Sequence, residues 1–233
     1  MQSTSATYQR IANDQYNARG KVTIDGTDYG EAELYEVTIR RNVFGEENPC
    51  VGSCIAAEID ISFKEPPGSI TRMAQILPYI QIYNSTETSE WIPKGVFYID
   101  TRSTDEDSKK LYIHGYDSML KAEAPYPASA MAWPAKDSNV LTEIALNMDV
   151  EIDDRTWDII PQSGTYDIQF PAAYTMREVL GFIAGMHGGN FIINDNGELQ
   201  LIALNGLPET SDLLINENGY YITFGGTRIK LRR

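Results

Sequence analysis

The sequence is poor in the residues that build most metal and disulfide sites. Its 233 residues include two cysteines, Cys50 and Cys54, and two histidines, His114 and His187. A structural zinc site needs four ligands at suitable spacing, and these four residues do not provide it. Two cysteines are also too few for the disulfide framework of a small secreted protein. We expect two unpaired thiols, with a local disulfide as the alternative, and no metal or other cofactor.

Positive charge is scarce as well. The chain has 19 Lys and Arg residues against 33 Asp and Glu residues, so its formal net charge is −14. Nucleic acids and anionic membranes attract basic surfaces, so neither is expected as a stable partner. No apolar run is long enough to cross a bilayer, and residues 1–17 lack the apolar core of a signal peptide. We expect no membrane insertion and synthesis in the cytoplasm.

Tyrosine, in contrast, is abundant. There are 14 Tyr against 7 Phe, within an apolar content of 42% and a charged content of 22%. This composition allows a buried core. Tyrosine suits half-buried sheet surfaces and protein interfaces, so it favours β structure and contact surfaces.

The first half of the chain predicts a short arm followed by an antiparallel β-barrel. Residues 1–18 have apolar side chains at helical spacing, which predicts an N-terminal helix, with a frayed tail as the alternative. Residues 19–120 contain strands at 21–25, 34–41, 55–64 and 75–84. The clearest is 55–64, where Ile55, Ala57, Ile59, Ile61 and Phe63 alternate with polar or small residues. That period of two places one face on a core.

A hairpin closes this predicted barrel. Its strands span residues 95–101 and 109–116, and residues 103–108 form a polar, acidic turn. In the alternating segment 34–41, we expect Tyr35, Val37 and Ile39 to share one face. After the hairpin, residues 116–121 predict a single helical turn that leaves the sheet.

The second half predicts a small α+β domain after a linker. Residues 121–137 contain Pro125, Pro127 and Pro134 and form the expected linker. Within 138–205, the pattern predicts a helix that Asp137 or Ser138 caps and a strand at 166–170. It also predicts a helix with a capping box at 175–178 and a hairpin across 191–202. Residues 206–233 predict strands, either truncated or completing a barrel with another subunit.

Several clusters contain residue types that also occur in reactive sites. The acidic runs 105–107 and 149–154 lack the glycine of a calcium loop. The run 149–154 is better explained as a strand with one solvent-exposed face. Glu58 and Asp60 lie two apart on one strand, which is typical of a solvated strand face rather than of a hydrolase. Three serines have no triad or nucleophile-elbow context: Ser53, Ser118 and Ser163. We therefore assign no catalytic, cofactor-binding or metal-binding residues and expect no enzymatic activity.

The order of elements resembles the N-terminal hub region of tail proteins from long-tailed phages and prophages of Gram-positive bacteria. The resemblance spans residues 19–205. Four segments carry it: 21–26 (KVTIDG), 94–100 (KGVFYID), 112–121 (YIHGYDSMLK) and 175–184 (TMREVLGFIA). It implies a barrel followed by an α+β domain in a trimeric ring at the tail tip. Such a ring contacts the distal tail protein, joins the tail tube to tip and fibre parts, and gates the channel.

The resemblance thus predicts a structural subunit of a tail-tip baseplate hub, located in the virion tail and partnered by copies of itself and by neighbouring tail proteins. An acidic ring lumen would repel DNA phosphates during transit. The alternative is a β-sandwich carbohydrate- or receptor-binding module, which an exposed aromatic row of Tyr79, Tyr83 and Trp91 would favour. A cell-wall hydrolase is a third class, for which the sequence offers no site.

Overall fold

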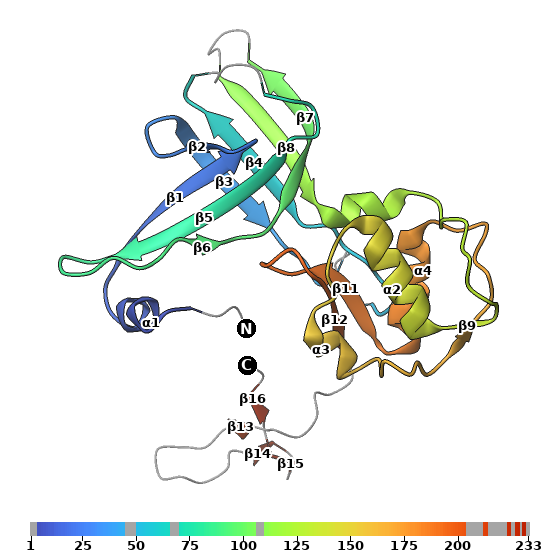
Figure 1. Cartoon of the computed structure of the whole chain (residues 1–233). Coiled ribbons are helices and arrows are strands. Elements are labelled where there is room, and N and C mark those ends of the chain that lie inside the picture. Colours follow the sequence, from blue (N-terminus) through green and yellow to red (C-terminus); the bar gives the residue numbers. More distant parts are fainter. Residues whose placement is uncertain are drawn as a thin grey trace.

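The computed structural model describes residues 4–44, 50–65, 70–105 and 110–203, with the backbone of four short strands between residues 212 and 231 (Figure 1). Those strands pair as β13 (Asp212–Leu213) with β16 (Lys230–Leu231), and β14 (Thr223–Phe224) with β15 (Thr227–Arg228). The predicted strand end at 66–67, the acidic tip at 106–107 and most of the predicted C-terminal strands lie outside the described residues.

One antiparallel sheet of eight strands forms the first unit, in the order β2-β1-β5-β7-β8-β4-β3, with β6 paired to β5. The mainly β prediction with antiparallel sheets is confirmed. The bounds are β1 (Asn17–Ile24), β2 (Thr27–Tyr29), β3 (Leu34–Arg40), β4 (Glu58–Phe63), β5 (Gln75–Tyr83), β6 (Ile92–Pro93), β7 (Phe97–Thr104) and β8 (Leu111–Asp117).

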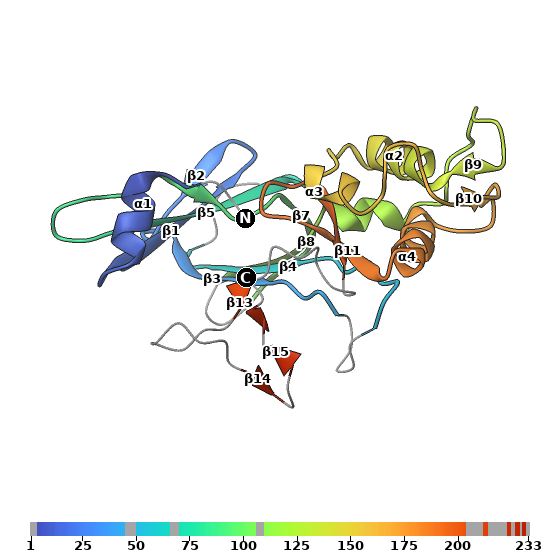
Figure 2. The same cartoon turned by 90° about the horizontal axis from the view of Figure 1, so that it is seen from below.

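The sheet curls around a single apolar core. Figure 2 shows β1, β2 and β5 on one side of this unit and β3 and β4 on the other, connected through β7 and β8. Inward side chains from both sides form one buried cluster, which includes Val22, Ile59, Ile76 and Ile113. Among the described residues no strand pair joins β2 or β1 to β3, so the closed barrel stays a prediction.

The predicted alternation holds in β4 and fails at one point of β3. Ile59, Ile61 and Phe63 are buried in the core, as their period of two requires. In β3 the register shifts between residues 34 and 36, which is a β-bulge. The extra residue, Tyr35, is 64% exposed, so its predicted place beside Val37 and Ile39 was wrong. A bulge reverses the alternation because two residues oppose one partner.

The N-terminal helix α1 (Ala6–Ala12) is shorter than the predicted 18-residue arm, because residues 17 and 18 belong to β1. The Ser5 hydroxyl caps it by accepting from the Tyr8 amide at 3.0 Å. Ile11 is 1% exposed, and Arg10 forms an ion pair with Glu87 at 2.6 Å. These contacts attach the helix to the sheet next to β5.

A helical turn and an irregular segment connect the sheet to the second unit. The 3-10 helix η1 (Ser118–Glu123) follows β8 directly, where the sequence predicts a single turn. Ala122, Tyr126 and Ala135, from the proline-containing stretch 121–137, belong to the buried core of the second unit. Cys54 belongs to it too, because the segment before β4 crosses over and forms a parallel bridge with Phe191.

The second unit packs three helices on a β-hairpin. They are α2 (Asp137–Met148), α3 (Asp154–Trp157) and α4 (Met176–Met186), and the hairpin is β11 (Gly189–Ile193) with β12 (Leu199–Ala203). The short strands β9 (Ala135–Lys136) and β10 (Asp167–Ile168) pair beside α2. The predicted capping box is present, since Thr175 and Glu178 each accept the other's backbone amide.

Candidate functional site

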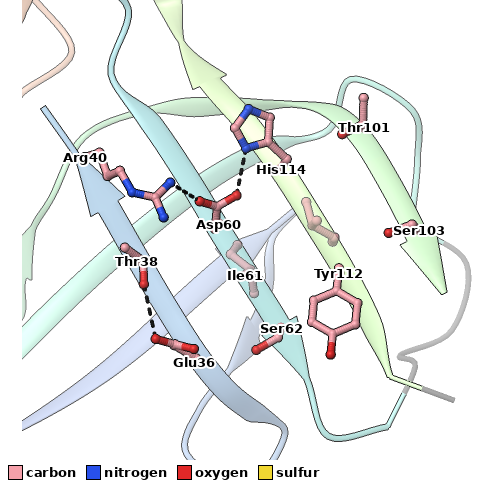
Figure 3. A pocket seen from close by; sticks show the side chains of 11 residues that line it. Glu36, Thr38, Arg40, Asp60, Ile61, Ser62, Thr101, Ser103, Tyr112 and His114 are labelled. Atoms are coloured by element: carbon pink, nitrogen blue, oxygen red, sulfur yellow. Dashed lines mark hydrogen bonds and ion pairs between the residues drawn. The ribbon is translucent and has the colours of Figure 1, made fainter. Parts of the chain in front are cut away.

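A polar hollow of about 320 Å³ lies on the outer face of β3, β4, β7 and β8 (Figure 3). Asp60 lines it between Arg40 and His114. The Arg40 guanidinium donates to Asp60 at 2.5 Å, and the His114 ring nitrogen lies 2.7 Å from the other carboxylate oxygen. Burial raises the pKa of Asp60, but the hydrogen bonds from His114 and Arg40 outweigh burial and hold that pKa below its ordinary value.

The predicted carboxylate pair is part of this network. Glu58 lies 3.8 Å from the same Arg40 guanidinium, so both carboxylates on β4 neighbour one cation. The side chains of Glu58 and Asp60 are each 40% exposed, in agreement with a solvated strand face. A glycosidase needs one carboxyl group that stays protonated as an acid. The lowered pKa of Asp60 does not fit the role of that acid.

A second polar network joins the curled sheet to the helical unit. Arg41, just after β3, forms an ion pair with Asp195 in the β11–β12 turn, and its guanidinium donates to the Lys94 carbonyl at 2.6 Å. Lys94 also reaches Asp195 at 3.2 Å. The buried amide of Asn190 donates to the carbonyls of Val43 and Cys50, each at 2.8 Å. These bonds fix the position of one unit relative to the other.

Asp117 is the buried acid at this junction. It ends β8, is 2% exposed, and accepts from the Ala57 amide at 2.8 Å and from the Met119 amide at 2.9 Å. Burial raises its pKa to about 6, although the two amides and the charges of Arg41 and Arg177 act in the other direction. The residue therefore connects β8, the segment before β4 and η1, and it titrates near neutral pH.

Another buried acid, Asp137, holds together the outer part of the helical unit. Its carboxylate accepts from the amides of Ser138 and Thr165 and lies 2.8 Å from the His187 ring nitrogen. Burial raises the pKa of Asp137, but the His187 bond and the amides outweigh burial and lower it. His187 also packs against the Tyr166 ring, with the ring centroids 5.2 Å apart, so it is a packed histidine.

The outer face of α4 carries exposed apolar side chains. Phe182 is 51% exposed and Met186 is 38% exposed, one helical turn apart. The Tyr174 ring, 44% exposed, packs edge-on against Phe182 at 5.1 Å. We name Tyr174, Phe182 and Met186 the α4 patch. Apolar patches of this kind are typical of protein contacts.

The aromatic row considered as a sugar platform is covered by cations. Arg19 lies over the rings of Tyr83 and Trp91, at 5.6 and 5.7 Å from their centroids. Lys21 lies over Tyr79 and Trp91, each at 5.2 Å. Cation–π contacts of this type use ring faces on which a sugar would otherwise stack.

The remaining candidates do not assemble into a reactive site. Cys50 is exposed and Cys54 is buried, both thiols are free, and burial raises the pKa of Cys54 to about 12. Within the described residues, no three His, Cys, Asp or Glu side chains are grouped to hold a metal ion. The three serines, Ser53, Ser118 and Ser163, do not come together with either histidine in any described hydrogen bond.

The strand predicted for 149–154 was wrong. Only Ile152 forms a bridge there, with Leu199, and α3 begins two residues later. Asp153 caps α3 by accepting from the Arg155 amide and binds the Asn194 amide at 2.7 Å. Capping and turn formation by acidic residues compete with strand pairing.

Comparison with known proteins finds matches among solved structures only. No family model and no curated protein matches the chain. The 43 kDa tail protein of prophage MuSo2 from Shewanella oneidensis superposes with a TM-score of 0.54 and 11% identity, over 84% of this chain and 59% of that one. At this identity the match shows a shared fold, and the chain spans 59% of that relative's length.

Two other tail-protein structures align more weakly. A tail protein from Neisseria meningitidis gives a TM-score of 0.49 at 13% identity, covering 85% of this chain and 54% of that one. The prophage tail protein gp18 from Listeria monocytogenes gives 0.48 at 12% identity, covering 88% and 56%.

Proposed function

We propose that the chain is a structural subunit of a phage or prophage tail-tip baseplate hub. In this proposal it assembles as a homotrimeric ring that connects the tail tube to tip and fibre parts and gates the channel. The observation that carries the proposal is the fold shared with the Shewanella prophage tail protein over 84% of this chain. The location that follows is the virion tail.

The surface supports an assembly role. Eleven large hydrophobic side chains are exposed in the described part of the chain, among them Tyr35 on β3, Tyr112 on β8 and the α4 patch. A stable interface buries roughly 1,200–2,000 Å² in total and is enriched in aromatic residues and Met. The α4 patch has that composition, and we propose it as a contact with a neighbouring copy of the chain.

We propose no enzymatic role. Asp60, one of the two neighbouring carboxylates on β4, is bound to Arg40 and His114. Asp137 and His187 bind each other inside the fold rather than in an open cleft, with side chains 0% and 7% exposed.

Among the helices that the structure describes, none has the length and apolar character of a membrane span.

The net negative charge of the chain would affect how DNA passes through the channel of such a ring. With a net charge of −14, a ring of copies that turned acidic surface inward would repel DNA phosphates and limit sticking during transit. A ring structure with its acidic side chains on the outside would remove this part of the proposal.

The mass of the purified chain in solution tests the proposal. Native mass spectrometry and light scattering at increasing concentration should show a trimer. Phe182→Glu places charge in the α4 patch and should shift the distribution toward monomer. Leu146→Glu is the matched control, because Leu146 is 78% exposed on α2 and outside the patch. A chain that stays monomeric at all concentrations contradicts the ring.

The alternative, a β-sandwich carbohydrate- or receptor-binding module, depends on Tyr79, Tyr83 and Trp91. Because Arg19 and Lys21 lie over these rings, the structure favours it less. Glycan-array binding by a monomeric chain, lost on Trp91→Ala, would decide for the module.

A further inference from the structure

The curled sheet leaves two strand edges without a partner among the described residues. β2 pairs with β1 only along Val22–Ile24, so the edge of residues 17–21 is open on that side. At the other end of the sheet, β3 pairs with β4 and with no other described strand. Open edges carry backbone N–H and C=O groups that are ready to accept another strand.

An apolar groove of about 400 Å³ lies between these edges. Val22 and Ile80 line it from the β1–β5 side, and Val37 and Ile39 line it from β3. Gly20 leaves room, since a Cβ built there would meet only the Tyr79 carbonyl, at 3.7 Å. The side chains of the chain itself therefore leave the groove open. Val37 and Ile39 on β3, which contact the core, are only half-buried beside it.

The charges around the groove are opposite in sign to the chain as a whole. Arg19, Lys21 and Lys94 line it, against one carboxylate, Glu31. Lys21 binds Asp28 at 2.7 Å and Lys94 binds Asp195 at 3.2 Å. Arg19 donates to the neutral amide oxygen of Gln81 instead, at 2.9 Å. Arg19 is therefore the lining cation to which the described residues supply no carboxylate, so an acidic side chain of an occupant could pair with it.

We propose that this groove binds an extended, acidic segment of a partner protein, which adds to the sheet as a strand between β1 and β3. Alternate side chains of a strand point to opposite faces. Apolar residues would face Val22, Val37 and Ile39, and acidic residues between them would face Arg19. Main-chain bonds supply affinity in this mode, and side-chain pockets supply specificity.

The topology adds a constraint on direction. Every described pair along the path from β1 to β3 is antiparallel, through β5, β7, β8 and β4. β1 and β3 therefore run in opposite directions. A strand placed between them would be parallel to one and antiparallel to the other. Direct pairing of β1 with β3 would be antiparallel, so the direction of pairing distinguishes insertion from direct closure.

Synthetic peptides of about ten residues, long enough for one strand, test the proposal. The probe alternates Val and Glu. The controls are the same composition arranged in two blocks, and an alternating Val–Lys peptide. Fluorescence anisotropy should show binding of the alternating acidic peptide only. Hydrogen exchange should show new protection in residues 17–21 and 37–40, and little elsewhere.

Two variants examine the groove itself. Arg19→Glu reverses the rim charge, and Lys136→Glu, in the helical unit on β9, is its matched control. Gly20→Val fills the open space and retains good strand propensity. Arg19→Glu and Gly20→Val should each weaken binding by about tenfold or more, and Lys136→Glu should not. Circular dichroism confirms that each variant is folded.

Three results would overturn the proposal. One is equal binding of the alternating and block peptides, which would indicate charge alone. Another is binding that protects residues outside the two edges. The third is protection of the same edges on raising the protein concentration without peptide, which would assign the groove to a second copy. The trimer measurement does not depend on these outcomes, so failure here leaves the hub proposal standing.

Discussion

Replacing Asp117 with Asn should change how the stability of the protein depends on pH. The unfolded chain has an Asp pKa near 3.9, and burial raises the folded pKa of Asp117 to about 6. Between these values the folded state holds a proton that the unfolded state has lost. The stability that this group contributes is present below pH 4 and falls as pH rises toward and through 6. Because the folded and unfolded pKa values differ by about 2, the total loss of unfolding free energy from this group is about 3 kcal/mol.

The Asn variant lacks this titration. It keeps one side-chain oxygen for the amides of Ala57 and Met119, so it loses one hydrogen bond at a cost of about 1–2 kcal/mol at every pH. The difference between wild type and variant should therefore move by about 1 kcal/mol between pH 5 and 8, in favour of the variant as pH rises. Most of the remaining loss lies below pH 5, close to the sequence pI of about 4.5, where solubility limits the measurement.

Urea unfolding at pH 5, 6, 7 and 8 measures this difference directly. Asp100→Asn, at an exposed position on β7, is the control and should keep a constant difference from wild type. Unfolding free energies of wild type and Asp117→Asn that run parallel across this range would show that Asp117 does not titrate there. The account of its burial would then be wrong.

Further substitutions probe packing. Phe191→Ala should cost about 3–5 kcal/mol in urea unfolding, because Phe191 is 0% exposed, whereas Phe182→Ala at 51% exposure should cost under about 1 kcal/mol. Gly181→Ala should lower Tm, since its Cβ would lie 2.8 Å from a crossing backbone carbonyl. Gly185→Ala, at 3.6 Å, should stabilise α4 by up to about 1 kcal/mol. Thr175→Ala should cost about 1 kcal/mol through the lost cap. Reversed rankings within either pair would contradict the packing described.

Local signals in the sequence were reliable where one physical rule decides the outcome. The capping box at the start of α4 and the β11–β12 hairpin formed where predicted, because each depends on residues a few positions apart. The alternation of β4 placed Ile59, Ile61 and Phe63 in the core. The bulge at Tyr35 escaped prediction because register depends on the opposing strand.

Long-range contacts account for what the sequence did not predict. The prediction that Asp137 or Ser138 caps a helix was wrong, because α2 has Lys136 at its N-cap and no side-chain cap. Besides the neighbouring Ser138 amide, Asp137 binds residue 165 and His187, 28 and 50 positions away. Arg41 and Asp195, 154 positions apart, join the two units. Such pairs carry no local pattern, and only the folded topology brings them together.

By itself, the sequence determined the β-rich class, the alternation of β4, the capping box of α4 and the acidic balance, because these follow from composition and short-range patterns. The tertiary structure alone decided how far the sheet curls, which acids are buried, and where a groove remains between β1 and β3. Those features depend on how strands far apart in the chain meet, and on how much space their side chains leave.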